Sequence, residues 1–189
     1  LQRDGLFGHI CYDYKNELEP KLSSRHPVRV GFPQLFFFIP EVVCHINTGC
    51  TTLTIETLGS APSAIMEEIN GQGAETNPTL PRLTFQQRIE KQRYLQTIDT
   101  LRRHIIDGDC YEINFCNEGY CEGADVDPLA VFNKLNAISP APFAAFYRSG
   151  DKYMLCASPE RYMRKECNTI LSQPIKGTAP RNAEKAKDE

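Results

Sequence analysis

The chain has 189 residues, of which 41% are hydrophobic, enough for one domain of ordinary size, or one domain and part of another, with a core of its own. Its 21 lysines and arginines and 24 aspartates and glutamates give a net charge of −3, too small to indicate a nucleic-acid or membrane surface. The most apolar run, residues 35–39, is far shorter than the roughly 20 residues of a membrane span. The first residues show no signal-peptide pattern, and we expect a cytoplasmic protein.

The eight cysteines are too sparse for a disulfide scaffold, in which cysteine reaches about 8–10% of the residues. The sequence contains no C-x-x-C pair, so the ligand spacing of zinc ribbons and thioredoxin-like motifs is absent. We therefore expect reduced cysteines that fill the core as small side chains.

The first 80 residues are predicted to be rich in β-structure. Short strands are expected at residues 6–12, 35–39, 42–46 and 52–57. The strand at 35–39 is apolar on both faces, so we expect it to be buried on both sides. Asn47-Thr48-Gly49 predicts a hairpin turn between the next two strands. A short helix is expected at residues 64–70, and a loop follows it.

The clearest helix of the sequence begins after residue 81. Thr84 and Gln87, three residues apart, have the spacing of a capping box at its start. An apolar stripe at helical spacing then continues to Ile105. Gly108 is expected just beyond the end of this helix, where glycine is the preferred residue.

The second half of the chain alternates strands and turns. A strand is expected at residues 111–115, and Asp127-Pro128 predicts the start of a second helix that runs to about residue 136. Further strands are expected at residues 143–148, 153–157, 161–165 and 169–173. Hairpin-linked strands that outnumber the helices predict an α+β fold with largely antiparallel sheets. Residues 183–189 are strongly helix-forming and contain no glycine stop, so we expect the polypeptide to continue beyond residue 189.

Glu160 and Lys176 are the candidate pair for chemistry. Glu160 lies between the predicted strands at 153–157 and 161–165, in Ser158-Pro159-Glu160-Arg161, and Lys176 follows the predicted strand at 169–173. A turn near residue 167 would bring both side chains to the same end of the hairpin. The alternative reading of this pattern is a surface ion pair, which contributes about 0–1 kcal/mol to stability. A phosphate-binding loop is excluded because the order is Lys-Gly-Thr and the leading glycine is absent.

The chain resembles the chorismate-utilising enzymes in several strings that occur in the order of that family. Those strings are Phe7–Glu17, Gly31–Phe38, Gly108–Asn114, Ala157–Arg161 and Pro174–Arg181. The resemblance covers nearly the whole chain, and its most specific parts are SPER and PIKGT. It implies two mostly antiparallel β-sheets packed together with flanking helices, here incomplete, with the active site between the sheets. Residues 1–80 are then a β-rich N-terminal part, and residues 81–189 are the first part of the chorismate-binding catalytic domain.

Lys176 distinguishes between branches of this family. Anthranilate synthases usually carry a small residue at that position, whereas lysine resembles the aminodeoxychorismate synthases. The resemblance implies a transferase that aminates chorismate to 4-amino-4-deoxychorismate, for p-aminobenzoate and folate synthesis. Lys176 is then the covalent nucleophile, Glu160 is the general acid, and Gly177 and Thr178 line the substrate pocket.

The lysine must be neutral to attack. At an ordinary pKa of about 10.4, fewer than about one amine in a thousand is neutral at pH 7. Burial or the neighbouring basic residues would lower that pKa.

The family also implies a cofactor and a partner. We expect Mg²⁺, with its ligands beyond residue 189 and none within this chain. A glutamine amidotransferase subunit is expected to supply ammonia. This stretch by itself is expected to be inactive. Two other readings stay open: an anthranilate synthase component I or another chorismate-utilising enzyme, and a non-catalytic piece or binding module with the same fold.

Overall fold

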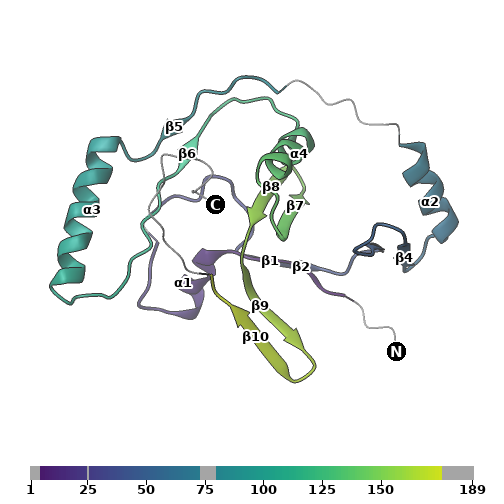
Figure 1. Ribbon diagram of the computed structural model, residues 1–189, viewed down its shortest axis with the longest axis horizontal. Helices are drawn as coiled ribbons and strands as arrows, with labels where there is room; N and C mark the ends of the chain where they lie inside the picture. Colours follow the sequence, from purple (N-terminus) through teal and green to yellow (C-terminus); the bar gives the residue numbers. More distant parts are fainter. Residues whose placement is uncertain (1–4, 25, 73–79, 176–189) are drawn as a thin grey trace, which may run out of the picture. The chain divides into compact units, whose positions relative to one another are not determined.

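The computed structural model of the protein describes residues 5–24, 26–72 and 80–175 (Figure 1). This part of the chain forms short strands with helices between some of them. Their bounds are β1 (Phe7–Ile10), the 3-10 helix η1 (Tyr12–Tyr14), α1 (Lys15–Leu18), β2 (Leu35–Phe38), β3 (Val42–Ile46), β4 (Leu53–Thr57), α2 (Pro62–Gly71), β5 (Gln86–Gln87), α3 (Lys91–Ile106), β6 (Gly119–Tyr120), α4 (Pro128–Ile138), β7 (Phe143–Ser149), β8 (Lys152–Ser158), β9 (Arg161–Glu166) and β10 (Thr169–Gln173).

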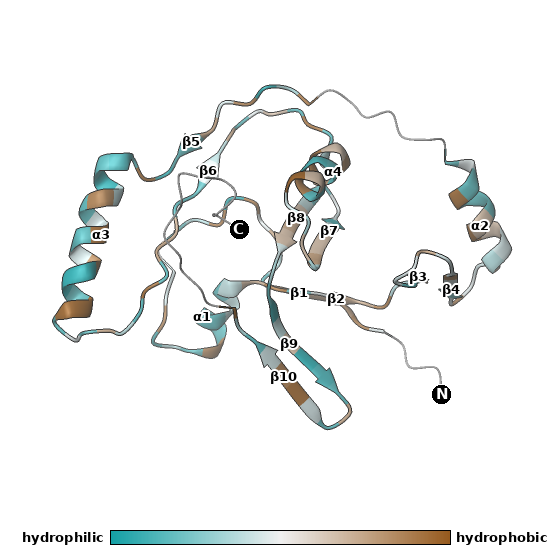
Figure 2. Ribbon diagram, in the orientation of Figure 1, coloured by the Kyte–Doolittle hydropathy of each residue, from teal (hydrophilic) through white to brown (hydrophobic). Residues whose placement is uncertain are grey.

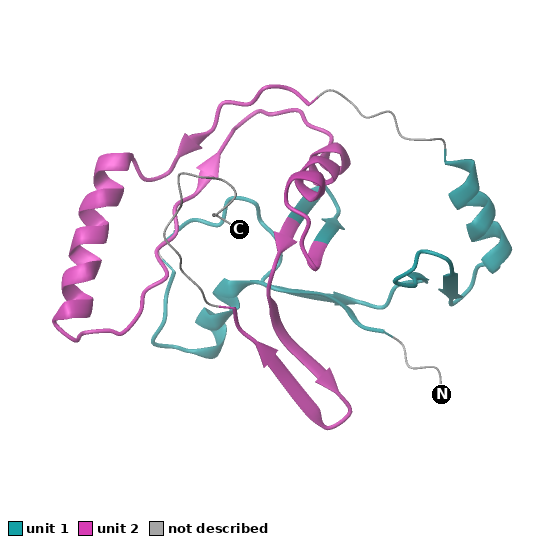
Figure 3. Ribbon diagram, in the orientation of Figure 1, with its two compact units in different colours: residues 1–77, 145–155 teal, residues 78–144, 156–189 magenta. Residues whose placement is uncertain are grey.

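The chain divides into two compact units (Figure 3). The first contains Leu1–Asn77 and Ala145–Leu155, and the second contains Pro78–Ala144 and Cys156–Glu189. The β7–β8 hairpin therefore contributes residues to both units. The expected division into parts before and after residue 80 stays a prediction.

The strands of the described residues pair into five two-stranded sheets. The β1–β2, β3–β4, β5–β6 and β9–β10 ladders are antiparallel, which confirms the α+β prediction. The hairpin turn predicted at Asn47 is also confirmed. The side-chain oxygen of Asn47 accepts hydrogen bonds from the backbone N–H groups of Thr51 and Thr52, at 2.8 and 3.0 Å. This side chain replaces backbone acceptors at the turn, as asparagine commonly does.

The prediction that the strand at residues 35–39 is buried on both sides is wrong. The strand forms as β2, but Phe36, Phe37 and Phe38 are each 39% exposed. β2 pairs only with β1 among the described strands, and a two-stranded ribbon covers neither of its own faces. The apolar residues specify a strand, but burial depends on elements that pack against it.

The capping box predicted at Thr84 and Gln87 is also wrong. Helix α3 begins at Lys91, after Glu90 as its N-terminal flanking residue. Gln87 instead lies in β5, which pairs with β6. The N–H of Arg88, next to this ladder, donates to the carbonyl of Glu118 at 2.9 Å, and the helix starts six residues later than a cap at Thr84 predicts.

The ends of the two longest helices agree better with the sequence. Gly108 has φ +83°, and its N–H donates to the carbonyl of Ile105 at 3.2 Å, so it ends α3 as predicted. The carboxylate of Asp127 accepts from the N–H groups of Leu129 and Ala130 at the start of α4. Ala130 is also the one apolar residue of the described chain that is almost fully buried.

Two further expectations fail. Residues 111–115 form no strand, although their side chains alternate in polarity. All eight cysteines are free, but each is half-buried or exposed. The expectation that they fill a core is wrong because most of them lie on or beside two-stranded sheets, which enclose no interior.

A polar cluster ties η1 and α1 to the loop that follows them. Lys15 Nζ donates to Asp13 Oδ1 at 2.8 Å and to Ser24 Oγ at 3.0 Å. The Ser24 hydroxyl also donates to Asp13. The hydrogen bond from Lys15, and then that from Ser24, hold the pKa of Asp13 below its ordinary value, because both favour the ionised carboxylate.

This cluster predicts a pH dependence. A carboxyl group whose pKa is lowered by folding stabilises the protein above its unfolded pKa of about 3.9. That contribution is lost as the pH falls through the lower folded pKa. We expect Ser24→Ala to raise the Asp13 titration midpoint, measured by NMR of the side-chain carboxyl carbon. Ser23→Ala is the control and should leave it unchanged. An Asp13 midpoint at or above the ordinary value in the unaltered protein would contradict the prediction.

Candidate active site

Glu160 lies at the open end of the β9–β10 hairpin. The turn of this hairpin contains Cys167 at φ +50°, near the residue where the sequence predicts it. Thr169 pairs with Glu166 next to the turn, and Gln173 pairs with Arg161 at the open end. The register shifts once, between Leu171 and Gln173. β9 is mostly hydrophilic, whereas β10 carries hydrophobic residues (Figure 2).

The carboxylate of Glu160 lies beside the backbone that follows β10. The N–H of Ile175 donates to Glu160 Oε1 at 3.1 Å. This contact brings the acid next to the residue that directly precedes Lys176 in sequence. The hairpin therefore places Glu160 at the end at which β10 leaves the sheet. Lys176, Gly177 and Thr178 lie outside the described residues, and their roles stay predictions.

The backbone of Glu160 is held by Ser158, the last residue of β8. The N–H of Glu160 donates to Ser158 Oγ at 3.3 Å, and the Ser158 hydroxyl donates to the carbonyl of Glu160 at 3.1 Å. On the other side, the guanidinium of Arg161 lies 4.8 Å from the ring centre of Phe143, within the range of a cation–π contact. Ser158, which precedes the acid by two residues, and Arg161, which follows it, thus each contact a defined group, and Glu160 itself is exposed.

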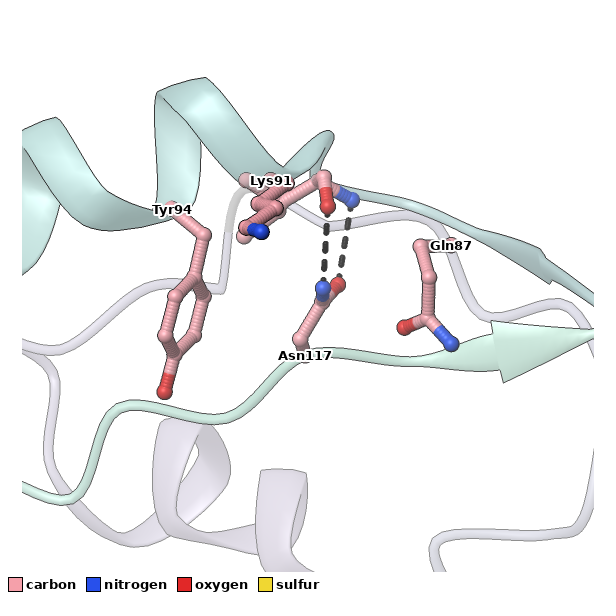
Figure 4. Close-up of a pocket in the computed structure, with 5 residues that line it drawn as sticks. Gln87, Lys91, Tyr94 and Asn117 are labelled. Carbon is pink, nitrogen blue, oxygen red and sulfur yellow. Dashed lines mark hydrogen bonds between the residues drawn. The ribbon is translucent and has the colours of Figure 1, made fainter.

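A second feature is an open pocket of about 450 Å³ in the second unit, which no sequence pattern predicts. Its lining residues are Gln87, Ile89, Lys91, Tyr94 and Asn117 (Figure 4). The side chain of Asn117 donates to the carbonyl of Ile89 at 2.9 Å and accepts from its N–H at 3.0 Å. The amide of Asn117 is therefore used to join two segments of backbone, and we assign the pocket a structural role.

The two hydrogen bonds between the Asn117 side chain and the Ile89 backbone should stabilise the folded protein. Asn117→Ala removes both hydrogen bonds, and we expect a loss of about 1–3 kcal/mol in the free energy of unfolding. Urea unfolding of the full-length protein measures this loss, and hydrogen exchange of the Ile89 amide shows whether it is local. Asn114→Ala is the matched control, since it removes a side-chain amide three residues away and leaves both hydrogen bonds between Asn117 and Ile89 in place. An Ile89 amide that stays equally protected in both variants would contradict the assignment.

Within residues 5–24, 26–72 and 80–175, no group of three histidine, cysteine, aspartate or glutamate side chains is arranged to hold a metal ion. None of the helices in the same ranges is both long enough and apolar enough to cross a membrane.

Comparison with known proteins identifies the family of this chain. The chorismate binding enzyme family matches residues 1–189. Aminodeoxychorismate synthase from Streptomyces griseus is 35% identical over 133 residues, which cover 68% of this chain and 18% of that protein. Anthranilate synthase component 1 from Thermus thermophilus is 25% identical over 193 residues, which cover 97% of this chain and 41% of that protein.

A solved structure has the same fold. The crystal structure of anthranilate synthase component I from Streptococcus pneumoniae matches with a TM-score of 0.74 at 19% identity, over 88% of this chain and 41% of that chain. The chain belongs to the chorismate binding enzyme family. It spans no more than about two fifths of the length of these relatives.

Proposed function

We propose that this chain is part of an enzyme that aminates chorismate at C4 to give 4-amino-4-deoxychorismate. Relatives named aminodeoxychorismate synthase support this proposal, as does the lysine in the Pro174–Thr178 string. The observation that carries it is the 3.1 Å hydrogen bond from the N–H of Ile175 to Glu160 Oε1. That bond holds a carboxyl group beside the residue adjacent to Lys176, where an acid and a nucleophile would act together.

In the proposed reaction the Lys176 amine attacks C2 of chorismate. The C2–N bond forms, the two conjugated ring double bonds shift from C1=C2 and C5=C6 to C1=C6 and C4=C5, and the C4–O bond breaks. Glu160 donates its proton to the departing hydroxyl group, which leaves as water. Ammonia then attacks C4, the two double bonds shift back, and the C2–N bond breaks as the lysine leaves as a neutral amine with a proton that the attacking ammonia gives up. One difficult substitution is thereby divided into two easier ones, with the amine at the position the hydroxyl occupied.

The proposal includes a partner and a metal ion. Ammonia is supplied by a glutamine amidotransferase subunit; the name of the Thermus thermophilus relative, component 1, is in keeping with a second component. Mg²⁺ is expected to bind a substrate carboxylate. The described residues offer no cluster that fits this ion, so no step above passes through it.

Anthranilate synthesis is the second candidate. The relative that aligns with 97% of this chain carries that name. In that reaction ammonia attacks C2 directly, which requires space where the lysine side chain would stand. The presence of Lys176 favours the first candidate.

The test is the identity of the product. The full open reading frame is incubated with chorismate, Mg²⁺ and ammonium, and the product is identified by chromatography and mass spectrometry. We expect 4-amino-4-deoxychorismate. Anthranilate as the product would overturn the proposal in favour of the second candidate. Failure of a confirmed full-length protein to turn over chorismate would favour a binding module.

A further inference from the structure

Glu160 is restrained at both its backbone and its side chain. It lies in the short passage between the end of β8 and the start of β9, directly after Pro159, whose ring fixes its own φ angle. The Ser158 hydroxyl makes reciprocal hydrogen bonds with the N–H and carbonyl of Glu160. The N–H of Ile175 then binds one carboxylate oxygen, Oε1, at 3.1 Å. An exposed glutamate normally samples many rotamers, so these contacts select one of them.

The side-chain contact also makes the two carboxylate oxygens different. A backbone N–H is only a donor, so Oε1 must direct a lone pair at it. When Glu160 carries a proton, that proton therefore sits on Oε2. The hydrogen bond from Ile175 engages Oε1 and not Oε2, so Oε2 is the oxygen that can carry the proton to a leaving group.

We infer that Ser158 and the N–H of Ile175 position Glu160 so that Oε2 is the oxygen that delivers the proton to the leaving group. This inference rests on the proposed function. Ser158 does not touch the substrate in this account. It acts as a positioning residue, because it fixes the backbone from which the acid extends, and the amide of Ile175 fixes the orientation of the carboxyl group.

Misplaced catalytic groups slow chemistry more than binding. Removal of the Ser158 hydroxyl should therefore lower kcat while KM for chorismate stays nearly constant. A displacement of the acid by about 1 Å costs up to about 100-fold in rate, so we expect Ser158→Ala to lower kcat by about 10- to 100-fold. Ser158→Thr keeps a hydroxyl group at the same atom and should restore most of the loss.

Ser172→Ala is the matched control. The Ser172 hydroxyl also donates to a backbone carbonyl of the same hairpin, that of Tyr162, at 3.3 Å. Both variants lose one hydroxyl-to-carbonyl hydrogen bond, but only Ser158 contacts Glu160. We expect Ser172→Ala to keep the kcat and KM of the unaltered protein. In a further variant, an ester replaces the peptide bond between residues 174 and 175, which removes only the N–H of residue 175. This variant should reproduce the kcat effect of Ser158→Ala.

The experiment uses the full open reading frame with ammonium as the nitrogen source. Glu160→Gln is measured beside the other variants to separate two kinds of failure. If Glu160→Gln keeps normal turnover, the proposed role of the acid is wrong and the function itself is in question. If Glu160→Gln is inactive but Ser158→Ala and the ester variant behave like Ser172→Ala, the positioning inference alone is overturned. Thermal unfolding checks that Ser158→Ala is folded, and the ester variant tests the same inference independently if it is not.

Discussion

Lys176→Ala should lower the formation of 4-amino-4-deoxychorismate by roughly 10³-fold or more, because it removes the atom that forms the covalent bond in the proposed reaction. A small side chain at this position leaves space for ammonia to attack C2 directly. Any residual turnover is therefore expected to shift toward anthranilate. Product analysis of the full-length protein with chorismate, Mg²⁺ and ammonium measures both effects in one assay.

Two further variants separate the nucleophile from its charge. Lys176→Arg keeps a positive charge, but a guanidinium is always protonated and cannot attack, so it should be as inactive as Lys176→Ala. Lys165→Ala removes a lysine from β9 of the same hairpin and should leave turnover unchanged. Activity retained by Lys176→Arg would show that the residue supplies charge only, and the covalent step would then be abandoned.

The elements that the sequence predicts well are those fixed by their own residues. The β9–β10 hairpin follows from two short alternating segments and the turn between them, and the structure places that turn at Cys167. Helix α4 follows from Asp127 and Pro128, since the cap is made by the side chain of Asp127 itself. No distant partner is needed for either element.

The failures share a different physical cause. Thr84 and Gln87 have the spacing of a capping box, but Ile89 in the same stretch is bonded to Asn117, 28 residues later. The local preference is overridden by a long-range contact that no short pattern records. The prediction that β2 is buried is wrong for a similar reason, since the exposure of a strand depends on which elements lie against it and not on its own residues.

One part of the candidate site could be predicted from the sequence and another could not. The hairpin predicted from the sequence puts Glu160 at its open end. The hydrogen bond from the N–H of Ile175 confirms that Glu160 lies beside the segment that leads to Lys176. The two hydrogen bonds between Ser158 and the backbone of Glu160 could not be predicted from the sequence, because a serine two residues before a glutamate is not a distinctive pattern. The roles of Lys176, Gly177 and Thr178 rest on the family resemblance and stay predictions.

Glu160→Gln should lower kcat by about 10²- to 10⁴-fold, the usual contribution of a general acid. Glutamine has the same shape, and its side-chain oxygen still accepts the hydrogen bond from Ile175, so the geometry of the hairpin end is preserved. It has no acidic proton to give to the departing hydroxyl group. We therefore expect chorismate binding, measured by isothermal titration calorimetry, to change little while turnover is lost.

Glu166→Gln provides the control for this change. Glu166 lies next to the turn at the other end of β9 and interacts with Arg164. The same substitution there removes one charge from the same hairpin, but at the turn end of β9, away from residue 175. Turnover should be unchanged in Glu166→Gln. If Glu166→Gln and Glu160→Gln reduced kcat equally, the effect would come from the charge of the hairpin, and Glu160 would have no special role as the acid. A selective loss in Glu160→Gln instead requires a proton donor at the open end of β9, because charge and shape are matched between the two variants.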